Sequence, residues 1–199
     1  MRRTAIVFLL TASALWALDK GDGFSVRPAE EYPNHQTQEK ITVAAVPYTT
    51  QADQKAAFDK ARPYDYGILP ILLVIKNDTG KVVSVDLETQ FVTKDDQHVD
   101  PTPAKDVQVF EGIQKVPGAR TPNPIGIPLP RRNKNGPLNV AEIYDRSWGI
   151  KLIPPGEQVY GFIYFQAKDL SGASLYLSGL RDAATKQAYF YFEIPLDKK

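Results

Sequence analysis

The stretch that decides the fold is ILPILLVIKNDTGKVVSVDLETQFV, residues 68 to 92. Its first part belongs to a run, 66 to 77, that is apolar on both alternating faces, which predicts a central strand covered on each side. Its second part alternates cleanly, and this predicts a half-buried strand whose inward side chains are Val83, Val85, Leu87, Thr89 and Phe91. The turn residues of 77 to 81 predict that a hairpin joins the two strands.

Asn77, Asp78 and Thr79 also form a glycosylation triplet. Asparagine, aspartate and glycine are equally typical of tight turns between strands. We interpret the triplet as turn chemistry.

Five further segments have the pattern of short strands bounded by turn residues. They are 41 to 48, 104 to 110, 158 to 167, 173 to 180 and 187 to 196. In the last of them, we expect Phe190, Phe192 and Ile194 to face the core, with Tyr189 and Tyr191 outside.

One short helix is predicted between residues 49 and 62. Thr50 followed by Asp53 resembles a capping box with Asp in place of Glu. Ala57, Phe58 and Ala61 give a narrow apolar stripe.

About seven strands, one short helix and no repeating βαβ pattern predict an all-β, antiparallel sandwich. A barrel stays open as an alternative, because strand counting does not separate closure from stacking. The runs ILPILLVIKNDTGKVVSVDL, IPPGEQVYGFIYFQ and LYLSGLRDAATKQAYFYFEIPL resemble uncharacterised exported bacterial proteins with an immunoglobulin-like, telokin-like sandwich. The resemblance spans roughly residues 41 to 196. It implies a fold and an extracytoplasmic location, and it carries no catalytic residue across.

The amino terminus has the pattern of a secretory signal peptide. Arg2 and Arg3 precede an apolar run and then Ala12-Ser13-Ala14, a small-residue cleavage site. The run is shorter than the roughly 20 residues that cross a bilayer, so a permanent anchor is the weaker interpretation. We predict a signal peptide over 1–17, cleavage after Ala14 or Ala17, and a periplasmic or secreted protein that is not membrane-embedded afterwards.

Composition narrows the partners. Loss of Arg2 and Arg3 would reduce the 24 basic residues of the chain to 22, against 23 acidic residues, so no general attraction to nucleic acid is expected. The absence of cysteine excludes disulfides, thiolate nucleophiles and thiolate metal sites. Residues 18–40 are polar and aperiodic and predict a flexible leader, so that 41–199 would be the sandwich domain.

Residues 112 to 139 form the least typical part of the chain. They contain six prolines, four glycines and five basic residues, with no acid. Proline restricts the residues before it to extended conformations and blocks edge pairing, so one interpretation is a structural clasp. The other adds recognition, in which Arg131, Arg132 and Lys134 grip an acidic envelope polymer or protein.

No catalytic signature is present: the chain lacks a nucleophile elbow, a zinc-protease motif and a phosphate-binding loop. His35 falls in the expected leader, where a base would not be held in place. Asp96, His98 and Asp100 are spaced by two, which on a strand would put two carboxylates and an imidazole on one face. We therefore expect a non-enzymatic exported binding or structural module without cofactors, and the alternative is an extracytoplasmic enzyme or metal-binding protein that uses those three residues.

Overall fold

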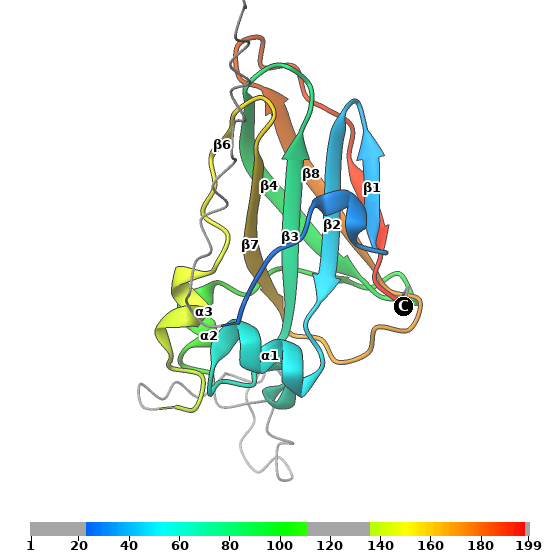
Figure 1. Cartoon of the computed structure of the whole chain (residues 1–199). Helices are drawn as coiled ribbons and strands as arrows, with labels where there is room; N and C mark the ends of the chain where they lie inside the picture. Colours follow the sequence, from blue (N-terminus) through cyan, green and yellow to red (C-terminus); the bar gives the residue numbers. More distant parts are fainter. Residues whose placement is uncertain (1–22, 111–135, 198–199) are drawn as a thin grey trace, which may run out of the picture.

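Two antiparallel sheets stack face to face in the computed structural model, which describes residues 23–110 and 136–197 (Figure 1). The first sheet has the order β1-β2-β3-β7, formed by His35–Gln38, Ile41–Pro47, Leu69–Asn77 and Gln158–Phe165. The second has the order β5-β4-β8-β9, formed by His98–Val99, Val83–Val92, Ser174–Asp182 and Phe192–Pro195, and β6 (Leu152–Ile153) pairs with β4. An all-β antiparallel sandwich is thus confirmed, with nine strands in the described part of the chain where the sequence predicted seven.

Short helices gather at one end of the sandwich (Figure 1). They are α1 (Gln51–Phe58), α2 (Ala104–Val107) and α3 (Ala141–Asp145). The described residues also contain two 3-10 turns, η1 (Ala29–Glu31) and η2 (Pro63–Tyr66). The sequence predicted a single helix, so it underestimated the helical structure. The predicted cap of α1 is confirmed, because the Thr50 hydroxyl accepts a hydrogen bond from the Asp53 amide at 3.1 Å.

Strand β3 is buried on both faces, as its apolar run predicts. Leu69, Ile71 and Leu73 lie in the core between the sheets. Leu72 and Val74 point the other way, into a second apolar cluster on the outer face of the first sheet. That second cluster is closed by α1, α3 and the segment before β1, so the molecule has three layers at this point.

The predicted hairpin between residues 66–77 and 82–92 is wrong. β3 pairs with β2 and β7, whereas β4 pairs with β5, β6 and β8 in the other sheet, so the intervening turn crosses between sheets. Asn77 holds this crossing: its fully buried amide donates to the carbonyls of Lys81 (2.7 Å) and Ile153 (2.9 Å), and its oxygen accepts from the Thr79 amide (3.1 Å). Alternation reports which face of a strand is buried and leaves its partner strand open. The buried amide supports turn chemistry over glycosylation.

Residues 104 to 110, expected as a strand, begin with helix α2. Pro103 occupies the N-cap position of this helix. Val107 and Phe110 lie three positions apart and both enter the outer cluster, at 0% and 5% exposure. Spacing by three places side chains on one face of a helical turn, and in so short a segment it is hard to separate from strand alternation.

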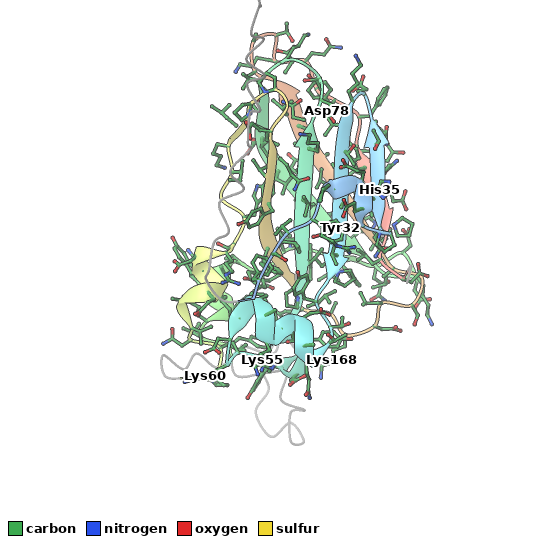
Figure 2. The ribbon with its side chains drawn as sticks, in the orientation of Figure 1. Tyr32, His35, Lys55, Lys60, Asp78 and Lys168 are labelled. Carbon is green, nitrogen blue, oxygen red and sulfur yellow. The ribbon has the colours of Figure 1, made fainter. Side chains whose placement is uncertain are left out.

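The described part of the expected flexible leader, residues 23–40, belongs to the sandwich. β1 pairs along its length with β2. Ala29 and Tyr32 are buried against the first sheet. His35 lies on β1, exposed, with its Nδ1 2.5 Å from the carbonyl oxygen of Tyr32 (Figure 2). The polar residues of β1 gave no signal of a strand. The segment is anchored by a few buried apolar side chains that precede the strand in the chain.

The last strand is shorter than predicted. Phe192 and Ile194 are buried, as expected, but Phe190 is 64% exposed and its assignment to the core is wrong. β9 begins only at Phe192, so strict alternation does not extend back to residue 190. Tyr189 packs against the core instead, and exposed Tyr191 stacks on Tyr176 with ring centroids 5.3 Å apart.

Candidate functional site

The predicted basic residues Arg131, Arg132 and Lys134 lie outside the described residues. The chain on either side of them is well placed. Phe110 and Leu138 are both buried in the outer cluster, and the Gln108 side-chain amide donates to the Val140 carbonyl at 2.8 Å. The points at which the chain leaves and rejoins the described structure are therefore fastened together beside α2 and α3, at the helical end of the sandwich.

Asp96, His98 and Asp100 surround the short strand β5. Asp96 Oδ1 lies 3.6 Å from His98 Nε2. Gln90 of β4 comes between the other two, because its Oε1 lies 2.8 Å from His98 Nδ1 and its Nε2 lies 3.4 Å from Asp100 Oδ1. Gln90 thus links His98 and Asp100 by hydrogen bonds, whereas Asp96 lies near His98 without a hydrogen bond to it.

Asp96, His98 and Asp100 do not gather around a common point in the structure. The Asp96 side chain is 91% exposed, and its residue adopts a left-handed turn conformation with φ of 59°. Across residues 23–110 and 136–197, no three His, Cys, Asp or Glu side chains converge as metal ligands would. Only His98 belongs to a strand, with Asp96 in the turn before it and Asp100 after its end, so the three residues do not share one strand face as the spacing suggested.

A cavity of about 700 Å³ opens at the outer edge of β7, beside the helical end. Its walls come from β4, from the segment 101–105, from the end of α3 with the residues that follow it, and from β7. The side chains that give it chemical character are Leu87, Thr89, Lys105, Tyr144, Asp145 and Trp148. Its volume falls within the range of about 300 to 1,000 Å³ that small-molecule sites occupy.

Residues 146–153 make the outer wall by crossing from one sheet to the other. Phe162 donates its amide to the Arg146 carbonyl and accepts from the Trp148 amide, both at 2.8 Å, so this segment first lies alongside β7 in parallel. It then reaches β4, where the Val85 amide donates to the Lys151 carbonyl at 2.9 Å.

Gly161 allows that close approach. A Cβ at this position would lie 2.9 Å from the Cα of Trp148 and 3.3 Å from its ring. Real Cβ atoms essentially never come so close to backbone, so a side chain here would push Trp148 away from β7. Glycine within the strand therefore sets the position of the cavity wall.

Two hydroxyls inside the cavity differ in what they bind. The Tyr164 hydroxyl donates a hydrogen bond to the Ile143 carbonyl at 2.8 Å. Burial raises the pKa of this phenol far above the ordinary range, so the group stays neutral and keeps this bond. Thr89 is only 7% exposed, and its hydroxyl makes no hydrogen bond to any residue that the structure describes. The sequence placed Thr89 among the inward positions of its strand, but nothing in it indicated a cavity there.

Comparison of the chain with protein-family models, with curated protein sequences and with solved structures gives no match. In the described ranges, no helix has the length and apolar character needed to cross a membrane.

Proposed function

We propose that this chain is an exported, non-enzymatic binding module of the cell envelope, with an immunoglobulin-like sandwich as its scaffold. Its recognition element is the proline-rich basic segment of residues 112 to 139, and its partner is an acidic polymer or protein surface. The observation that carries the proposal is the fastening of both flanks of this segment, through Phe110, Leu138 and the bond from Gln108 to Val140.

Fixed flanks matter for binding because ordering a segment costs conformational entropy. Each proline and each anchored end removes conformations before a partner arrives, so less entropy is lost on association. Arg131 and Arg132 supply planar guanidinium groups that pair bidentately with carboxylates or phosphates, and Lys134 adds a third positive charge. Proteins and polymers that carry such anionic groups are available outside the cytoplasm.

Export is tested by expressing the chain with residues 1–17 intact in a bacterium that has a periplasm. We expect recovery in the periplasmic fraction with an amino terminus at Leu15 or Leu18, because the small residues that precede them suit signal peptidase. Amino-terminal sequencing of both fractions makes the measurement. Cytoplasmic protein that still begins at Met1 would contradict export.

Recognition is tested by changing Arg131, Arg132 and Lys134 together to Glu. We expect the thermal midpoint to stay close to that of the wild type, because a surface charge typically contributes about 0 to 1 kcal/mol to folding. Binding to poly-L-glutamate and to polyphosphate should fall by at least tenfold at about 50 mM salt, because the local field is inverted and long-range attraction depends on screening. The two polymers separate carboxylate recognition from phosphate recognition.

A matched control changes Lys151, Arg181 and Lys186 to Glu. These residues are exposed and lie near the end of β8 that is opposite the helical end of the sandwich. Their substitution alters the net charge by the same amount. The control should bind as the wild type does. If both triple variants lose binding equally, only net charge matters; if the first variant binds normally at every salt concentration, the basic segment is a structural clasp.

A further inference from the structure

The cavity at the edge of β7 contains a hydroxyl to which the described residues make no hydrogen bond. Thr89 lines it, and its hydroxyl has no hydrogen-bond partner among residues 23–110 and 136–197. The residue as a whole is only 7% exposed, but its hydroxyl is not one of the fully buried polar atoms that lack a partner, so it remains accessible from the cavity. A ligand that covered this hydroxyl without bonding to it would leave a buried polar group unpaired, which is costly. A ligand that enters the cavity therefore gains by offering a hydrogen-bonding group at this depth.

The mouth of the cavity carries one charge of each sign. Lys105 and Asp145 both line it and are exposed, and no ion pair joins them. A ligand with a net charge would meet one attractive and one repulsive group. A neutral ligand with several hydroxyls would instead accept from the ammonium and donate to the carboxylate, two charge-assisted hydrogen bonds.

The rest of the cavity is apolar and partly aromatic. Tyr144, at 60% exposure, stands at the mouth, and Trp148 and Leu87 line the wall. Aromatic side chains present a flat apolar face together with a polar tip. Such a surface suits a molecule that is apolar on one side and hydroxylated at its rim.

We propose that this cavity binds a neutral sugar ring of a glycan. A saccharide ring combines C–H faces, which pack on Tyr144 and Trp148, with hydroxyls that serve Thr89 within and Lys105 and Asp145 at the mouth. A purely aliphatic ligand would leave the Thr89 hydroxyl buried and unpaired. This site uses different residues from the basic segment and does not depend on it.

Trp148 provides the assay. The chain has two tryptophans, Trp16 and Trp148, so the full chain with Trp16→Phe has its only tryptophan in the cavity wall. We expect saturable changes in its fluorescence on titration with at least one of cellotriose, maltotriose, laminaritriose and N,N′,N″-triacetylchitotriose. Tri-galacturonate, chitosan trimer and palmitate, titrated in parallel, represent anionic, cationic and aliphatic ligands and should give no saturable change.

The decisive variant is Thr89→Val, which keeps the shape of the side chain and removes only the hydroxyl. Because that hydroxyl has no described protein partner, the thermal midpoint should not fall, whereas sugar affinity should drop by roughly five- to tenfold, the usual effect of one hydrogen bond. Thr42→Val is the matched control, since Thr42 is also 7% exposed, lies on β2 and bonds to Thr37. It should leave affinity unchanged.

Three results would overturn the proposal. They are the absence of any saturable signal from all four neutral sugars at 10 mM, confirmed by unchanged amide resonances; a signal from a charged or aliphatic probe alone; and sugar binding that Thr89→Val does not weaken. Because Thr89→Val is expected to fold normally, loss of binding together with a much lower thermal midpoint would also count against it.

Discussion

Gly179→Ala should lower the free energy of unfolding by about 2 to 5 kcal/mol, the sum of backbone strain and steric conflict. Gly179 lies in β8 with φ of 89°, a conformation that side-chain-bearing residues rarely adopt. Its Cβ would fall 1.8 Å from the carbonyl oxygen of Asp86, in the middle of β4. The conflict is with backbone, at the point where the register of β4 against β8 shifts between Val85 and Glu88, so no side-chain rotation relieves it.

Two other glycines separate the contributions in urea unfolding. Gly80 has φ of 77° with nothing near its missing Cβ, so Gly80→Ala should cost only the strain, about 1 to 2 kcal/mol. Gly149 has neither the strained conformation nor a close neighbour, so Gly149→Ala should be nearly neutral. If Gly179→Ala is no worse than Gly80→Ala, the irregularity of β4 yields easily and the close approach does not constrain the sheet.

Leu73→Ala is the second large effect, at about 2 to 5 kcal/mol. Leu73 is fully buried in the core between the sheets, and its neighbours across the two ladders of β3 are Ala45 and Gly161. Both neighbours are small, so neither fills the space that the leucine leaves. The cost therefore includes a cavity as well as the lost burial of apolar surface.

The control for Leu73→Ala is Ser84→Ala on the solvent side of β4. Its hydroxyl donates to the Arg181 carbonyl at 3.2 Å in an exposed position, so the change should alter the free energy of unfolding by less than about 1 kcal/mol. Chemical denaturation of both variants makes the comparison. A larger loss in Ser84→Ala than in Leu73→Ala would mean that β4 presents the opposite face to the core.

Local signals predicted the elements whose burial is decided by neighbouring residues in the sequence. β3 is recognisable because both of its faces are apolar, and β4 because Val83, Val85 and Phe91 alternate with polar residues. α1 is recognisable because its cap, Thr50 with Asp53, is complete within four residues. In each case the interaction that forms the element lies within the element.

The pairing of the strands was not predicted correctly. β3 and β4 were expected to pair because a turn joins them, yet the turn crosses between sheets under the control of Asn77, whose partners include Ile153 from a distant part of the chain. β1 was missed because its polar residues are held by pairing with β2 and by apolar side chains before it. Proximity in the chain alone does not decide whether two successive strands pair with each other or enter different sheets.

The candidate sites follow the same division. The basic segment was recognised from composition, since its prolines and arginines are visible in any reading of the chain. The cavity was not, because Thr89, Lys105, Tyr144 and Trp148 come from three segments that are far apart in the chain, and each alone is an ordinary strand, helix or loop residue. Gly161, which sets the cavity wall, is distinguished only by what lies against it.

By itself, the sequence determined the fold class and most buried strand positions, because hydrophobic periodicity and helix capping act between residues a few positions apart. Only the tertiary structure decided which strands pair with each other. It also decided that residues 104–107 form a helix and that Thr89 and Trp148 line the same open cavity. Those features depend on contacts between residues far apart in the chain. Their free energy exists only once the two sheets have packed together.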